Sequence, residues 1–156
     1  MWAPRGVKVR QVLQLTYQWA YLALAVDGVS GRLWWAWQPN MKGVSVRQVV
    51  RAWRAAGLAA LVWDGAPGHR ARVVREVGMK LVSLPPAAPE LNPAERVFEE
   101  LRRAVEGRVY ATLADKQAAV ERELAALAAD PARVRRLAGW AWLRAALPPP
   151  EYAALS

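Results

Sequence analysis

The sequence predicts an α/β fold in which helices cover a mixed sheet, and three observations lead to it. Two aromatic-rich apolar segments near the start are separated by a turn sequence, which is typical of a β-hairpin. Predicted helices and strands then alternate along the middle of the chain, and the last part is helical. Because no repeat or linker interrupts this order, we expect one domain over residues 1–147 and a tail over 148–156.

The first elements are expected to be strands. Polar and apolar side chains alternate over residues 7–15, as they do in an edge strand. Residues 17–26 are almost continuously apolar, which indicates a strand buried on both faces. A turn cluster at 27–31 leads to a second aromatic strand at 32–37.

Helices and strands alternate after the hairpin. Gly57 and Gly78 each follow a segment with apolar residues at helical spacing, as glycines do at helix C-termini. The predicted elements are a helix over 45–56, a strand over 58–63, a helix over 69–77 and a strand over 79–84.

The next helix has the clearest pattern in the chain. Its apolar stripe occupies positions i, i+3, i+4, i+7 and i+11, namely Ala94, Val97, Phe98, Leu101 and Val105. Two further helices are expected to start at Thr112 and at Asp130-Pro131, and three consecutive prolines at 148–150 end the folded part.

The composition restricts the possible partners and cofactors. The 22 Lys and Arg residues exceed the 13 Asp and Glu residues, giving a net charge of +9 that favours a polyanion such as DNA. Solubility, or the residue usage of a GC-rich genome, would also account for this charge. There is no cysteine and only one histidine, so any metal must be held by carboxylates, which suit Mg²⁺ or Mn²⁺.

Two features concern localisation. The N-terminus lacks the apolar core of a signal peptide, and the longest apolar run, Trp19 to Val26, is too short to cross a bilayer. We therefore expect a cytoplasmic protein that makes no use of a membrane.

Two carboxylates are candidates for a metal site. Asp64 follows a buried strand and precedes a Gly-rich loop, where catalytic groups of α/β sheets reach solvent. Glu95 lies in the first turn of the stripe-bearing helix, and 30 residues separate the two. That interval holds one helix and one strand, enough to return the chain across the sheet. Two such carboxylates can share divalent cations.

Each candidate also has a purely structural interpretation. Asp64 before glycine can simply start a turn. Asn92 is suited to cap the helix, with Glu95 as its partner in a capping box. His69 can equally be a packed or capping residue. Periodicity alone does not decide among these interpretations.

Two longer motifs contain these residues. The segments Val62-Trp63-Asp64-Gly65-Ala66-Pro67-Gly68-His69 and Leu84-Pro85-Pro86-Ala87-Ala88-Pro89-Glu90-Leu91-Asn92-Pro93-Ala94-Glu95 resemble the DDE transposases of the Tc/mariner superfamily, bacterial insertion-sequence branch. A weaker resemblance runs from Trp2 to about Tyr110. The chain has Ala87-Ala88 where Tyr-Ser is usual and Phe98 where Trp is common.

The resemblance implies a ribonuclease-H-like fold and Mg²⁺- or Mn²⁺-dependent cleavage and joining of DNA strands. Asp64 corresponds to the second acidic residue of the family's triad and Glu95 to the third. His69 and Asn92 correspond to positions that support the site. Glu90 belongs to the same motif but precedes the helix, and ranks below Glu95.

The first acidic residue of the triad has no counterpart. In the family it lies on a strand upstream of a segment that here begins at Trp2, and Asp27, in a turn, is the only acidic residue before Asp64. We expect a catalytic-domain fragment that is inactive alone, from a split or decayed gene. The alternative is a non-catalytic DNA-binding or oligomerising remnant, whereas a repair nuclease on the same fold is disfavoured by the Pro-rich motif. The missing strand would expose a sheet edge, so a dimer or larger homo-oligomer is expected.

Clusters of basic residues are candidates for DNA contacts, and a solvated surface is the alternative for each. Nine tryptophans are expected mainly to pack in the core rather than to stack on bases. The predicted DNA-binding residues are Arg47, Arg51 and Arg54 at helical spacing, and Arg70, Arg72, Arg75 and Lys80 after the Asp64 loop.

Overall fold

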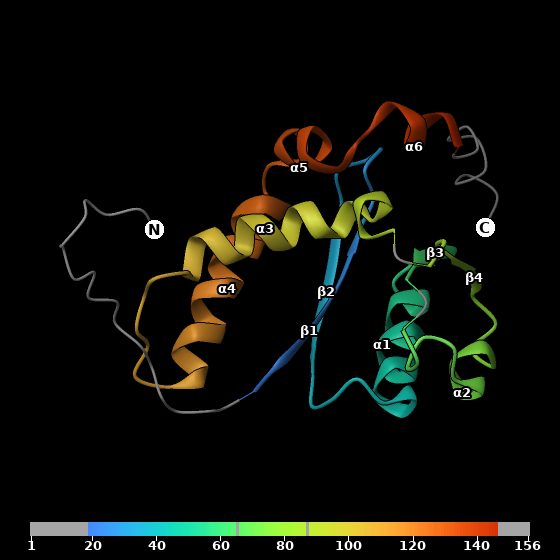
Figure 1. Cartoon of the computed structure of the whole chain (residues 1–156), viewed down its shortest axis with the longest axis horizontal. Helices are drawn as coiled ribbons and strands as arrows, with labels where there is room; N and C mark the ends of the chain where they lie inside the picture. Colours follow the sequence, from blue (N-terminus) through green and yellow to red (C-terminus); the bar gives the residue numbers. More distant parts are fainter. Residues whose placement is uncertain (1–18, 65, 87, 147–156) are drawn as a thin grey trace, which may run out of the picture.

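A computed structural model of the chain describes residues 19–64, 66–86 and 88–146, and its helices are arranged around two small sheets (Figure 1). None of the helices in these ranges has the length and apolar character needed to cross a membrane. The elements in chain order are β1 (Tyr21–Val26), β2 (Leu33–Gln38), α1 (Gly43–Ala55), β3 (Ala60–Trp63), α2 (Arg72–Arg75), β4 (Lys80–Ser83), the 3-10 turn η1 (Pro89–Leu91), α3 (Pro93–Val105), α4 (Leu113–Ala128), α5 (Pro131–Ala138) and α6 (Ala141–Ala146).

The predicted β-hairpin is confirmed. β1 and β2 pair antiparallel, with Leu24 opposite Trp35, and β1 begins at Tyr21 rather than at residue 17. The Asp27 carboxylate closes the turn, accepting hydrogen bonds from the backbone N–H groups of Val29 and Ser30 at 2.9 and 3.2 Å. Asp27 is thus a turn residue.

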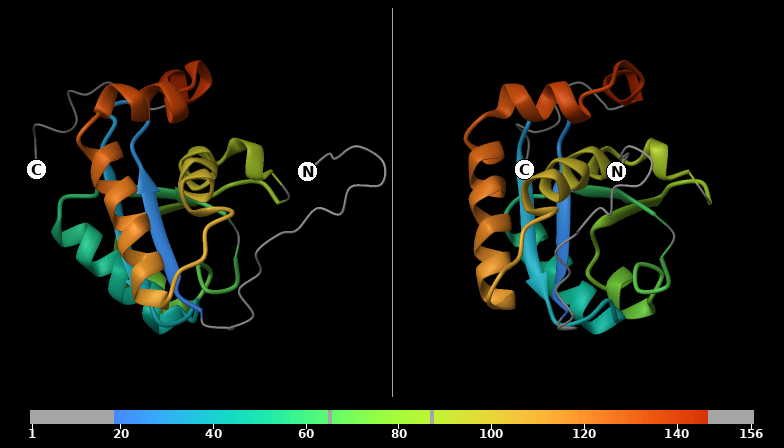
Figure 2. Two further views of the ribbon diagram at one scale, coloured as in Figure 1. Left: turned by 90° about the vertical axis from the view of Figure 1, so that its left-hand side faces the viewer. Right: turned by 60° about the vertical axis from the view of Figure 1, so that its left-hand side comes forward.

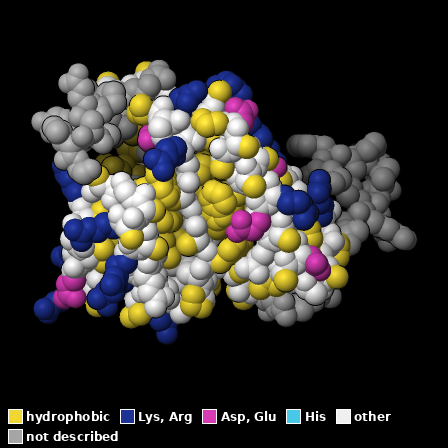
Figure 3. All heavy atoms as spheres, turned by 180° about the vertical axis from the view of Figure 1, so that it is seen from behind, with side chains coloured by type: hydrophobic (Ala, Val, Ile, Leu, Met, Phe, Trp, Pro, Cys, Tyr) yellow, Lys and Arg dark blue, Asp and Glu magenta, His cyan; other side chains and the backbone are white. Residues whose placement is uncertain are grey.

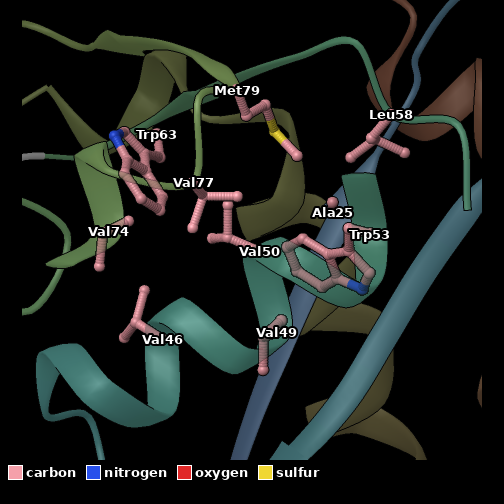
Figure 4. Packing of buried hydrophobic residues seen from close by; sticks show 10 residues of the cluster. All are labelled: Ala25, Val46, Val49, Val50, Trp53, Leu58, Trp63, Val74, Val77 and Met79. Carbon is pink, nitrogen blue, oxygen red and sulfur yellow. The ribbon is translucent and has the colours of Figure 1, made fainter. Parts of the chain in front are cut away.

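The prediction of one mixed sheet is wrong for the described residues. β3 and β4 form a separate parallel pair, and no backbone ladder joins them to the hairpin. The two sheets are connected through side chains instead. Figure 4 shows residues of α1 lying between Ala25 of β1 and Trp63 of β3, in one buried cluster. Patterns of hydrophobicity predict strands but not which strands pair, so sequence reasoning could not detect this separation.

The hairpin is covered on both of its faces, as the apolar run over 17–26 predicted. One face packs against α1, and the other packs against α3, α4 and α5. Figure 1 shows the hairpin between α4 and α1, and the right-hand view of Figure 2 shows α4 running alongside the hairpin. Alternation along the strand produces this arrangement, because Ala23 and Ala25 face the first cluster while Leu22, Leu24 and Val26 face the second.

The helix predicted over 69–77 is shorter in the structure. Only α2 is helical, because Ala71 before it has an extended backbone and residues 67–70 form turns. The helix predicted over 45–56 is confirmed as α1, which starts two residues earlier. Positive φ angles at Gly57 and Gly78 end the two helical segments, as expected.

The helical C-terminal part also agrees with the prediction. Thr112 caps α4 in a reciprocal capping box with Asp115, and the Asp130 side chain caps α5. Residues 131–139 lie across the hairpin turn. A Cβ atom at Gly31, whose φ is +80°, would lie 2.3 Å from the carbonyl oxygen of Pro131, so only glycine fits there. The strand predicted over 7–15 and the tail over 148–156 lie outside the described residues.

Candidate functional site

Asp64 lies immediately after the C-terminal end of β3, and its side chain is 60% exposed. One carboxylate oxygen, Oδ1, accepts the backbone N–H of Ala66 at 3.1 Å and lies 2.6 Å from Nδ1 of His69. Among the described residues nothing binds the other oxygen, Oδ2. The turn interpretation of Asp64 is therefore correct for one oxygen, while the second is available to a cation.

His69 is held against Asp64 by a stacked tryptophan. The His69 ring lies parallel to that of Trp63, with an interplanar angle of 3° and centroids 4.3 Å apart. Trp63 is buried at 8% exposure, and the His69 side chain is 17% exposed. The same geometry fixes which ring nitrogen faces Asp64. The imidazole can thus orient the carboxylate without occupying its free oxygen.

Glu95 lies in the first turn of α3. Asn92 caps this helix by accepting the backbone N–H of Ala94 at 3.1 Å, as predicted. The predicted capping box with Glu95 is wrong, because the Glu95 side chain does not return to the cap. Its Oε2 lies instead 3.9 Å from Nη2 of Arg102, and the side chain is 43% exposed. The Glu95 carboxylate therefore does not cap the helix.

Asp64 and Glu95 each carry oxygen atoms of the kind that a hard divalent cation prefers. Each comes from the end of a regular element, which fixes its backbone, and each has oxygen atoms open to solvent. Over residues 19–64, 66–86 and 88–146, no group of three or more acidic or histidine side chains is placed to hold a metal. Two ligands alone would bind such a cation weakly.

The basic residues predicted to bind DNA differ in whether another group of the chain already binds them. Arg72 is paired with Glu76 at 3.0 Å, and Arg75 donates to the carbonyl oxygen of Arg70 at 2.9 Å. Lys80 is exposed on β4. Arg47, Arg51 and Arg54 lie together on α1. Figure 3 shows Lys and Arg side chains gathered over the left-hand side of that view, where α1 and α2 lie.

Sequence reasoning missed the contribution of Trp63. The only signal was a tryptophan directly before Asp64 with a histidine five positions after it. A stack between residues six positions apart across a loop follows no helix or strand period, so a periodicity argument does not find it.

Comparison with known proteins supports the fold class. No curated protein matches the chain. Among solved structures, the chain is similar to the Mos1 transposase in its paired-end complex with the left transposon end, with a TM-score of 0.53 and 13% identity. That match covers 89% of this chain and 50% of the transposase, so the chain spans half the length of that protein. The likeness shows a mixed α/β fold of the ribonuclease-H-like type.

A sequence match identifies the family. The profile of the family described as DDE superfamily endonuclease matches residues 1–116, which is most of the chain and includes both Asp64 and Glu95. The chain belongs to the DDE superfamily endonuclease family.

Proposed function

We propose that the chain is part of the catalytic domain of a transposase of the Tc/mariner superfamily, nearest to its bacterial insertion-sequence branch, acting on DNA with Mg²⁺ or Mn²⁺. The observation that supports this most is the pair of carboxylates. Asp64 keeps Oδ2 free at a strand end, and Glu95 is not used for capping at a helix start. The likeness to Mos1, a transposase solved with its transposon end, supports the same reaction class.

Asp64 and Glu95 would be the ligands of this cation, and the other residues would position them. The cation, when bound, supplies the charge that stabilises the phosphodiester during attack and departure of its oxygens. His69 restricts the rotation of the Asp64 carboxylate through Oδ1, and Trp63 restricts the rotation of His69. Asn92 fixes the first turn of α3 and therefore the position of Glu95.

A second candidate is a non-catalytic DNA-binding remnant. It is favoured by the absence of a third metal-binding carboxylate among the described residues and by the engagement of Asp27 in its own turn. When several residues catalyse a reaction together, removing one of them usually removes most of the catalytic rate. Both candidates therefore predict that the 156-residue chain cleaves DNA poorly by itself.

Binding of Mn²⁺, followed by titration of its free-ion electron paramagnetic resonance signal, tests the proposed ligands. Asp64→Asn and Glu95→Gln should each weaken binding about tenfold or more, since even supporting residues of metal sites contribute that much. Glu90→Gln, from the same motif, is the matched control and should leave binding unchanged. Equal affinities in all four proteins would overturn the assignment of Asp64 and Glu95.

Nicking of supercoiled plasmid distinguishes the two candidates. Slow Mn²⁺-dependent nicking that Asp64→Asn abolishes would support a catalytic domain. Mn²⁺ binding without any nicking above the Asp64→Asn background would support the non-catalytic remnant.

We also propose that copies of the chain associate. In the described part of the structure, β1 and β3 each pair with one strand only, which leaves an edge of each sheet unpaired. Unpaired edges promote strand pairing between chains. Light scattering at micromolar concentration should give a mass of at least a dimer, and a monomer would contradict the proposal.

A further inference from the structure

Helix α1 combines three arginines with a complete lack of acidic residues. Arg47, Arg51 and Arg54 recur at intervals of four and three residues, so they lie on one side of the helix. With Ala55, Glu76 and Val77 they line a groove of about 560 Å³ between α1 and the end of α2. The groove is therefore bordered by basic side chains along one whole wall.

Five arginines on the other helices of the described structure are paired with glutamate. In contrast, Arg47 and Arg51 make no ion pair there, and α1 offers no acidic partner within the helix. The pairs on the other helices are Arg72–Glu76, Arg96–Glu99, Arg102–Glu95, Arg103–Glu100, Arg133–Glu100 and Arg133–Glu123.

The groove also contains an unsatisfied donor. Nε of Arg47 is shielded from solvent and has no hydrogen-bond partner among the described residues. A buried N–H group without an acceptor is unfavourable, so the fold does not use this guanidinium N–H to stabilise itself. Glu76, which also lines the groove, does not supply that acceptor, and its Oε1 is bound by Arg72 at 3.0 Å.

One wall of the groove is held in place by the backbone. Arg54 donates through Nη1 to the carbonyl oxygen of Val77, which fixes its guanidinium at the end of the groove. A Cβ atom at Gly78 would lie 3.1 Å from the same Nη1. The glycine that ends the α2 segment therefore also leaves room for this guanidinium.

We propose that this groove binds backbone phosphates of a nucleic acid. Residues 47 to 54 advance about 10 Å along a helix axis, and phosphates of one DNA strand are spaced about 3.4 Å along the duplex axis. The groove is thus long enough to contact more than one phosphate, which favours a polynucleotide over a free phosphate ion. Contacts to phosphates do not depend on base sequence.

The position of the groove relates it to the carboxylates. The N-terminal end of α1 packs on the loop that follows Asp64, where a Cβ atom at Gly43 would contact Ala71. Arg47 lies one helical turn further along α1. A strand bound in the groove would therefore lead from the end of α1 toward the loop that follows Asp64. This inference does not depend on metal binding by Asp64 and Glu95.

The salt dependence of DNA binding tests the groove. A fluorescein-labelled duplex is titrated by anisotropy in EDTA over a range of KCl concentrations, with wild-type protein and the double variant Arg47→Gln/Arg51→Gln. The double variant should reduce the slope of log K against log[KCl] by about 2, since each lost phosphate contact removes about 0.9. The matched control Arg122→Gln/Arg136→Gln removes two exposed, unpaired arginines from α4 and α5. Its slope should stay close to that of wild type.

Two results would overturn the proposal. One is an unchanged slope, which would mean that Arg47 and Arg51 do not contact phosphates, or the same reduction in the test and control variants, which would mean that only overall charge matters. The other is competition by inorganic phosphate for Arg47 and Arg51 without any effect of the double variant on DNA binding, which would mean a site for a free anion. Circular dichroism confirms that the variants are folded. The Arg47→Gln/Arg51→Gln variant keeps Asp64 and Glu95 and should bind Mn²⁺ as wild type does, so failure of the metal site would be seen separately.

Discussion

The two faces of the hairpin differ in what happens to charged groups. On the face covered by α3, α4 and α5, glutamates are bound by arginines or by indole N–H groups. On the face covered by α1, the arginines of the helix are largely unpaired, and Asp64 keeps a free oxygen at the end of β3. The first side uses its charged groups to hold helices and strands together, whereas the second leaves charged groups unpaired, as the proposed ligand binding requires.

Glu121 on α4 illustrates the first side. Its two carboxylate oxygens accept the indole N–H groups of Trp35 and Trp37, at 2.9 and 2.6 Å. Both tryptophans belong to β2 and point to the same side of the hairpin. One carboxylate therefore fixes α4 to the strand and satisfies two donors that would otherwise be unpaired.

Arg133 on α5 illustrates the same side. It binds Glu100 of α3 at 2.9 Å and Glu123 of α4 at 3.2 Å, and so joins three helices. Its pKa is raised above the usual value for arginine, because of the hydrogen bond to Glu100 first and the charge of Glu123 next, against the effect of burial. The guanidinium therefore stays charged, and its removal would leave Glu123 without this cation and Glu100 with Arg103 alone.

The largest effect should come from the core on the stabilising side. Leu124 is fully buried at 0% exposure. Leu124→Ala should lower the free energy of unfolding by about 3 kcal/mol, through lost burial and a cavity. Val62, 45% exposed on β3, is the matched control, and Val62→Ala should cost less than about 1 kcal/mol. Urea unfolding measures the free energy of unfolding of both variants. Equal losses in the two variants would contradict the difference proposed between the two sides of the molecule.

The next effect concerns the carboxylate between the two indoles. Glu121→Ala should cost about 2 kcal/mol in urea unfolding, because both indole N–H groups lose their acceptor. Glu121→Gln should cost less, since its amide oxygen still accepts one of the two hydrogen bonds. A loss below about 0.5 kcal/mol in the alanine variant would show that water replaces the carboxylate.

A smaller effect is expected at the junction of three helices. Arg133→Gln should reduce the free energy of unfolding by about 1 kcal/mol, since the pair with Glu100 is only partly buried. Added salt should narrow the difference between variant and wild type by screening the two glutamates from each other. A difference that grows with salt would contradict this account.

The smallest change in stability is expected on the ligand-binding side. Arg51→Gln should alter the free energy of unfolding by less than about 0.5 kcal/mol, because its exposed guanidinium has no partner in the described structure. Its DNA affinity at low salt should nevertheless fall. A loss of more than about 1 kcal/mol in the free energy of unfolding would show that Arg51 stabilises the fold. It would contradict the difference proposed between the two faces of the hairpin.

Local patterns in the sequence were sufficient for much of the fold. The hairpin, α1 and the stripe of α3 follow from turn residues and apolar spacing, and Thr112 and Asp130 cap helices as predicted. Interactions between distant residues were not predictable in this way. Trp35 and Glu121 meet across 86 positions, which no period of 2 or 3.6 residues encodes.

The candidate site was only partly readable from the sequence. The motif identified Asp64 and Glu95, but not that Glu95 is released from capping or that His69 is stacked on Trp63. Both depend on side-chain rotamers, and contacts with neighbouring residues of the fold select among the staggered rotamers that the backbone allows. The separation of the two sheets was missed for a related reason, since strand pairing is decided by contacts between elements.

The contact between the hairpin turn and residues 131–139 has a consequence for the order of folding. Arg135 donates to the carbonyl oxygen of Ser30, and the two residues are 105 positions apart. Gly28 likewise lies against the backbone of Ala138. During synthesis the hairpin must therefore wait until nearly the whole domain has left the ribosome before its turn is covered. Nascent chains that stop before this point should expose the turn to proteases, whereas slightly longer ones should protect it.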